Sequence, residues 1–99
     1  MYLIIWEFRS AQGAEKEFED HYGPQGVWAR FFQAGEGYIR TELLHDTRDD
    51  HRYLTIDYWT SQQEYETFRN QHADEYKAIN RRYESLTARE THVGSFIIK

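Results

Sequence analysis

The chain has 99 residues, no cysteine and a formal net charge of −5 at pH 7. This length fits a single domain. The acidic balance argues against a nucleic acid partner, which requires a basic face, and the lack of cysteine excludes disulfides, thiol catalysis and thiolate metal sites. No apolar run approaches the ~20 residues of a membrane span. Strand-like residues begin at Tyr2, where a signal peptide would lie, so a cytoplasmic protein is expected.

The sequence predicts strands and helices with aromatic residues, 17% of the chain, as the main core material. Runs of β-branched and aromatic residues indicate strands, and apolar residues three and four apart indicate helices. The single proline, Pro24, marks a bend in the helical arm that follows the first strand. The expected elements are a strand at 2–9, the helical arm at 14–22 and 24–35, a strand at 37–45, a polar loop at 46–51, a strand at 53–59, a long helix at 61–86, a connector at 87–90 and a last strand at 92–98.

The junction between the third strand and the long helix is the most informative stretch of the chain. Because side chains alternate along a strand, one face of it carries Tyr53, Thr55, Asp57 and Trp59. Ser61 followed by Glu64 is a capping-box pattern and predicts the helix start. The inward face of the helix is marked at steps of three and four by Tyr65, Phe68, His72, Tyr76, Ile79, Tyr83 and Leu86. Trp59 and Tyr65 are therefore expected to line one end of a shared pocket; the alternative is that both are core aromatic residues, with a hydrogen-bond partner for the Tyr65 hydroxyl.

The order of the elements predicts the fold class. Strand, helix, strand, strand, helix, strand is the ferredoxin-like βαββαβ arrangement, an α+β fold with two helices on one face of a four-stranded antiparallel sheet. The other face would expose apolar residues of the first, third and last strands as a patch larger than a monomer tolerates. We therefore predict a two-fold symmetric homodimer whose sheets pack face to face.

Two segments resemble a known family. Residues 53–61, Tyr-Leu-Thr-Ile-Asp-Tyr-Trp-Thr-Ser, with the aromatic Tyr65 after them, are similar to the antibiotic biosynthesis monooxygenase domain, a family of dimeric α/β barrels. Residues 22–32 with Gly37 and Tyr38 resemble one subgroup of it. The resemblance covers essentially the whole chain and implies a single domain. The same barrel also hosts haem-degrading enzymes, isomerases and ligand-binding modules, so the fold alone does not name the activity.

The resemblance implies oxygenation of a small phenol or hydroquinone by dioxygen, without flavin, metal or other cofactor. The protein then supplies a base, donors for the substrate oxygen and a dry apolar slot. Family members that form quinones use a tryptophan, a tyrosine and an asparagine, and their positions are held here by Trp59, Tyr65 and Thr55. The positions used by haem-degrading members carry Trp6 or Glu7, Phe68 and Ala78, so that activity is not expected.

Two side chains are candidates for the base, and each has a structural alternative. Asp57 lies in a strand that is expected to be buried, where a carboxylate needs either a raised pKa or a partner such as Arg40. His72 lies on the inward face of the helix, seven residues after Tyr65. A neutral imidazole there accepts a phenolic proton near neutral pH, or is simply a hydrogen-bonded core residue.

Two interpretations of function stay open. In the first, the domain is an oxygenase with Asp57 or His72 as the base, Tyr65 and Trp59 holding the substrate oxygen, and pocket walls formed by Trp6, Trp28 and Phe32. In the second, it is a non-catalytic dimeric module that binds a small hydrophobic ligand or a protein. The remaining histidines show no metal-binding spacing, so no metal site is predicted.

Overall fold

The structure is a computed structural model that describes all residues 1–99. Along the chain it contains β1 (Tyr2–Ser10), α1 (Glu15–Tyr22), α2 (Val27–Phe32), β2 (Tyr38–His45), β3 (Arg52–Trp59), α3 (Gln62–Gln71), α4 (Ala73–Tyr83), the short 3-10 helix η1 (Glu84–Leu86) and β4 (Thr87–Ile97). The sheet order is β2-β3-β1-β4, and every neighbouring pair is antiparallel. This arrangement confirms the predicted ferredoxin-like α+β fold.

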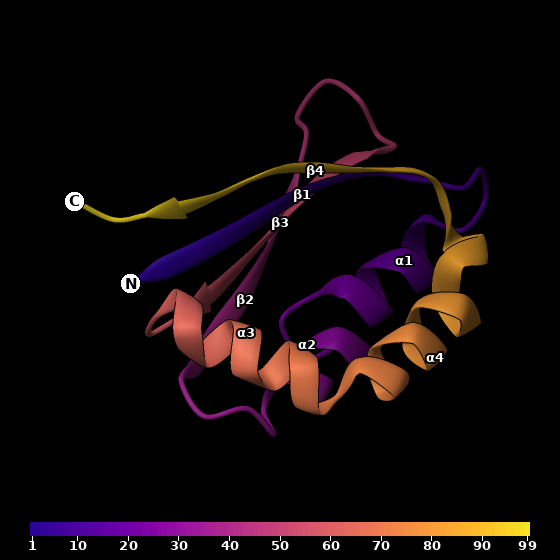
Figure 1. Cartoon of the computed structure of the whole chain (residues 1–99). Coiled ribbons are helices and arrows are strands. Elements are labelled where there is room, and N and C mark those ends of the chain that lie inside the picture. The colour runs from indigo at the N-terminus through magenta and orange to yellow at the C-terminus, as the bar shows by residue number, and fades with distance from the viewer.

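All helices lie on one side of the sheet, and the other side has no covering element (Figure 1). The core between the two layers is built from rings, as the composition predicts. Trp59, Tyr53 and Phe18 are its largest fully buried side chains. One cluster lies around Trp59 and a second lies around Phe18, and Trp6 and Trp28 pack against both. No helix in the fold is both long and apolar enough to cross a membrane.

The predicted long helix is two helices. The backbone leaves the helical region at His72, with φ −120° and ψ 30°, where α3 ends and α4 begins. Phe68 and Tyr76 lie four residues before and after this break. The apolar spacing therefore continues across it and does not indicate that the helix ends there. At the start of α3, the Ser61 hydroxyl accepts a hydrogen bond from the Glu64 amide at 3.2 Å, as the capping pattern predicts.

Two other predicted boundaries are wrong. Residues 87–90 are not a connector, because β4 begins at Thr87 and pairs with β1 over its whole length. The second part of the helical arm starts at Val27, beyond the turn that follows Pro24. Pairing with β1 places Glu90 opposite Phe8 on the helix side of the sheet. This longer strand therefore adds a charged residue to the covered face.

The uncovered face of the sheet is apolar. Leu3 and Ile5 of β1 have the parity opposite to the buried residues of that strand, and Ile5 pairs with Ile56 of β3. Leu3 pairs with Phe96 of β4, whose side chain is 48% exposed. A patch of apolar side chains thus runs across three strands with no part of this chain over it.

Candidate functional site

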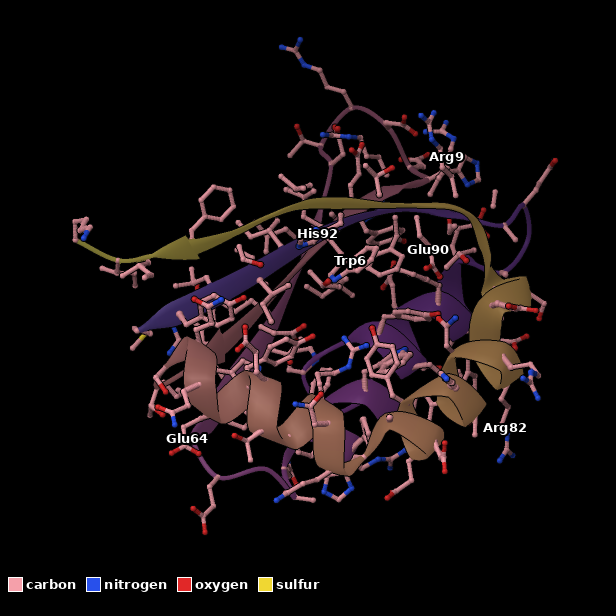
Figure 2. The ribbon with its side chains drawn as sticks, viewed as in Figure 1. Trp6, Arg9, Glu64, Arg82, Glu90 and His92 are labelled. Atoms are coloured by element: carbon pink, nitrogen blue, oxygen red, sulfur yellow. The ribbon has the colours of Figure 1, made fainter.

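A small pocket opens between the sheet and the helices. Its cavity measures about 50 Å³ and is partly open to solvent. Most of its wall is aromatic: Trp6, Phe8, Tyr22, Trp28, Phe32 and Tyr76. Figure 2 shows Trp6 on the helix side of the sheet, directed into the space between the two layers. The enclosed part has room for no more than a few water molecules, so an aromatic ligand has to extend into the open side or displace rings at the mouth.

The polar groups of this pocket come from five different elements. They are Thr41 from β2, Thr55 and Asp57 from β3, Tyr65 from α3, Asn80 from α4 and Glu90 from β4. Several polar groups converging in an aromatic cavity are the usual composition of a small-molecule site. No three His, Cys, Asp or Glu side chains converge as a set of metal ligands anywhere in the chain.

Asp57 is the buried charged residue of the pocket. Its side chain points inward because it shares the buried parity of β3, and the residue is only 9% exposed. The Thr41 hydroxyl donates a hydrogen bond to Asp57 Oδ1 at 2.6 Å. Burial raises the pKa of Asp57 to about 6, and the Thr41 hydrogen bond acts in the opposite direction. A carboxylate in this environment is a stronger base than an exposed one and still ionises near neutral pH.

Asp57 does not pair with an arginine, which was the structural alternative for this residue. Arg40 has the opposite parity on β2, and its guanidinium stacks on the Tyr58 ring at 4.0 Å and lies 3.9 Å from Glu42 Oε2. No ion pair of the chain includes Asp57. The carboxyl group is therefore stabilised by one hydroxyl donor and by no positive charge.

Tyr65 reaches the same pocket from α3, and Arg69 holds its hydroxyl group. Arg69 Nη1 donates to Tyr65 Oη at 2.8 Å, and the Arg69 guanidinium lies 3.6 Å from the centre of the Tyr76 ring. Guanidinium groups only donate hydrogen bonds, so the Tyr65 oxygen is the acceptor and its own hydrogen stays free. Burial raises the pKa of Tyr65 and the Arg69 hydrogen bond opposes that shift. Tyr65 is thus a neutral donor available to a ligand.

Six of the eight side chains that the sequence predicts for the site line this pocket: Asp57, Tyr65, Thr55, Trp6, Trp28 and Phe32. Trp59 lies outside it. Its ring is fully buried behind Tyr65 and packs against Phe32 and Phe68. Its Nε1 is buried without a hydrogen-bond partner.

His72 also lies outside the pocket, at the break between α3 and α4. Its Nδ1 is 2.9 Å from Glu75 Oε1, and its ring packs on Phe68 at 4.5 Å. A base has to come within hydrogen-bond distance of the proton that it removes. The structure brings Asp57 and Tyr65 together at one cavity and leaves His72 away from them.

Four polar groups at or near the site were missed in the sequence. Asn80 is four residues after Tyr76, so it lies on the same face of α4. Arg69 is four residues after Tyr65, a spacing that brings helix side chains together and could have identified it. Thr41 lies opposite Asp57 because of the register in which β2 pairs with β3, and this register could not be predicted from the sequence. Glu90 was missed because it was expected in a connector. Figure 2 shows Glu90 and His92 along β4 beside Trp6, and the Trp6 and His92 rings are 5.1 Å apart.

Comparison with known proteins agrees with this architecture. The model of the family described as antibiotic biosynthesis monooxygenase matches residues 1–82. SnoaB from Streptomyces nogalater, a cofactor-independent oxygenase, is 26% identical with a TM-score of 0.70, covering 99% of this chain and 92% of that chain. A protein from Pseudomonas aeruginosa is 18% identical with a TM-score of 0.72, covering 99% of this chain and 93% of that chain.

A third structure comes from a protein with a different activity. The haem-degrader MhuD from Mycobacterium tuberculosis, solved with two haems in its active site, is 18% identical with a TM-score of 0.70, covering 99% of this chain and 95% of that chain. At this level of identity the likeness shows the shared fold alone. No curated protein matches the sequence. Because the family model spans most of the chain, this protein belongs to the antibiotic biosynthesis monooxygenase family.

Proposed function

We propose that this protein is a cofactor-independent monooxygenase that acts on a small aromatic hydroxy or quinol-type compound with dioxygen. The observation that carries the proposal is the pairing of a buried base with a free donor: Asp57 and the Tyr65 hydroxyl line one aromatic cavity. SnoaB, which shares 26% identity with this chain, is a cofactor-independent oxygenase. The family and the local chemistry support this reaction class, and the fold is compatible with it.

The reaction starts with proton removal. Asp57 takes a proton from the substrate, and the resulting anion has its charge on an oxygen that accepts a hydrogen bond from Tyr65. Arg69 holds the Tyr65 hydroxyl in place and adds positive charge behind it. A substrate bound against the aromatic walls displaces water from the cavity, which strengthens these interactions.

The electron-rich anion then reduces dioxygen and forms a carbon–oxygen bond to it. The peroxide takes the proton back from Asp57. Loss of water from the hydroperoxide removes the hydrogen of the oxygenated carbon and leaves a carbonyl group. One oxygen atom of O₂ becomes this carbonyl oxygen, and the other leaves as water with the two hydrogens that the substrate has lost, one from its hydroxyl group and one from carbon. The substrate supplies all the electrons in this balance.

The proposal assigns the role of the base to Asp57 and not to His72. Asp57 lines the cavity, and its pKa, raised by burial to about 6, suits proton transfer near neutral pH. His72 is separated from the cavity and is bonded to Glu75. Substrate binding is assigned to Thr55, Trp6, Trp28 and Phe32, which line the cavity.

We also propose that the working form is a homodimer. The uncovered sheet face carries Leu3, Ile5 and Ile56, and a second copy of the same face is the simplest complementary surface. Two sheets packed in this way bury the apolar patch of each protomer.

A second function is favoured by one observation. The cavity of about 50 Å³ is smaller than a typical ligand site of roughly 300 Å³ or more. A non-catalytic dimeric module that binds another protein through its surface needs no enclosed ligand cavity, so the small volume favours this form of the module over one that binds a small hydrophobic ligand. The two functions differ in whether oxygen is consumed.

Oxygen uptake with anthrone-like and hydroquinone-like compounds tests the proposal. The purified protein is expected to consume oxygen without added flavin, nicotinamide or metal. Asp57→Asn is expected to lower the rate by about a hundredfold or more, and His72→Phe to leave it within about twofold. Absence of uptake above background across the panel favours the binding module, and full activity of Asp57→Asn refutes the assignment of the base.

A further inference from the structure

A chain of three hydrogen-bonding groups leads to the pocket from the edge strand of the sheet. The hydroxyls of Tyr38 and Thr41 are 2.8 Å apart, and the Thr41 hydroxyl donates to Asp57 Oδ1 at 2.6 Å. Thr41 is 4% exposed and lies directly across from Asp57 in the β2–β3 register. Tyr38 is half-buried at the start of β2.

The direction of this chain follows from counting hydrogens. Thr41 has one hydroxyl hydrogen and gives it to Asp57, so the bond between the two hydroxyls is donated by Tyr38. Both donors therefore point toward the carboxylate, and bonds aligned in one direction strengthen each other. Asp57 Oδ2 takes part in no hydrogen bond of the chain, and it is the oxygen left for a ligand.

We propose that Thr41 and Tyr38 are positioning residues for Asp57: they occupy Oδ1 with a donor and so keep both the basic lone pair and the acquired proton on Oδ2, at the pocket. The inference rests on the proposed function, because Asp57 is the base of that reaction. A carboxyl group whose Oδ1 accepts from Thr41 carries its proton on Oδ2. From there the proton can return to the peroxide.

None of the other charged and titratable groups around Asp57 takes the place of Thr41 as a hydrogen-bond donor to its carboxyl group. Tyr65, with Arg69 behind it, faces the pocket from α3, Tyr76 faces it from α4, and Glu90 lines it from β4. None of these groups forms a hydrogen bond or ion pair with Asp57. On β1 the neighbouring pocket residues, Ile4 and Trp6, offer no charge. The Thr41 hydroxyl is the only donor to the carboxyl group.

A carboxyl titration by ¹³C NMR tests the inference without any substrate. The Asp57 signal is assigned by its loss in Asp57→Asn. Its midpoint is expected to rise by about one pH unit in Thr41→Val, because the ionised form loses its donor. Tyr38→Phe is expected to raise the midpoint by a smaller amount. Thr41→Ser keeps the hydroxyl and is expected to restore the wild-type midpoint, and thermal unfolding identifies any variant that does not fold.

The pH profile of oxygen uptake gives the second readout. In Thr41→Val, kcat/KM is expected to rise at a higher pH than in the wild type, and this increase is expected to match that of the NMR midpoint. Its plateau, where Asp57 is ionised in every variant, is expected to fall about tenfold because the carboxylate is no longer held. Thr41→Ser is expected to recover both values.

The two readouts separate the inference from the proposed function. An NMR midpoint unchanged in folded Thr41→Val overturns the inference, whether or not oxygen is consumed. If the NMR midpoint shifts but the pH profile and plateau of oxygen uptake do not change, Thr41 has only a structural role. This result also overturns the inference. Absence of oxygen uptake by the wild type overturns the proposed function and with it the catalytic role of Thr41, while the NMR titration still decides the hydrogen-bond chain.

Discussion

The rings of Trp59 and Tyr65 meet edge to face, with centroids 5.3 Å apart and planes at 70°, but only Tyr65 reaches the pocket. Trp59 lies behind it as the fully buried centre of an aromatic cluster. The two residues are six positions apart on either side of one tight turn, and the turn places them at different depths. Their substitutions are therefore expected to have different effects.

Trp59→Phe is expected to change stability more than activity. Loss of part of a fully buried ring destabilises the fold by about 1 to 2 kcal/mol, because a cavity replaces it, and removal of the unpartnered Nε1 donor offsets some of that cost. Urea unfolding measures the first effect. The value of kcat/KM, measured well below the unfolding temperature, is expected to stay within about threefold of the wild type. A tenfold loss with unchanged stability would assign Trp59 to substrate binding.

Arg69→Met is expected to lower kcat/KM by about tenfold or more, because the charged donor that holds the Tyr65 hydroxyl is removed. The methionine keeps apolar contact with the Tyr76 ring. Steady-state oxygen uptake measures the change. If Arg69 acts through Tyr65, the same substitution in a Tyr65→Phe background has little further effect. Additive losses in the double variant would show that Arg69 contacts the substrate by itself.

Asp57→Asn is expected to stabilise the protein at neutral pH. Burial raises the pKa of Asp57 from an ordinary 3.8 to about 6, so the folded state binds the proton more tightly than the unfolded state. The stability that this proton contributes is fully present below about pH 3.8 and is lost as the pH rises through about 6. Above that range the ionised carboxylate costs about 3 kcal/mol, which the asparagine avoids.

Urea unfolding at pH 4 and at pH 7.5 measures this difference. Asp57→Asn is expected to be more stable than the wild type at pH 7.5. At pH 4 the difference is expected to be nearly absent. Asp20→Asn, which changes an exposed carboxyl on α1, serves as the control. An Asp57→Asn variant that is less stable than wild type at pH 7.5 would show that the carboxylate has a stabilising partner.

Ile56→Lys is expected to dissociate the proposed dimer. The substitution places a charge at the centre of the uncovered sheet face, where Ile56 pairs with Ile5 and Glu42. Light scattering at micromolar concentration measures the mass. The wild type and the helix-surface control Gln71→Lys are expected at twice the 12.0 kDa chain mass, and Ile56→Lys at the chain mass itself. A monomeric wild type across this range contradicts the proposal.

The sequence by itself determined the order of the strands and main helical segments and the faces of the residues in β3. Both are local properties: side chains alternate along β3, so Asp57 faces inward with Tyr53 and Thr55, whatever else the chain does. The start of α3 is equally local, because Ser61 and Glu64 are three residues apart. These features need no knowledge of distant segments.

Only the tertiary structure decided which groups meet at the pocket. Thr41 and Asp57 are 16 positions apart and meet because β2 and β3 pair in one register out of several. The break at His72 was invisible in the apolar spacing, which continues across it, and Glu90 entered the pocket only because β4 pairs with β1 from Thr87 onward. Strand register and helix breaks depend on contacts between segments far apart in the chain, and residue periodicity contains no information about such contacts.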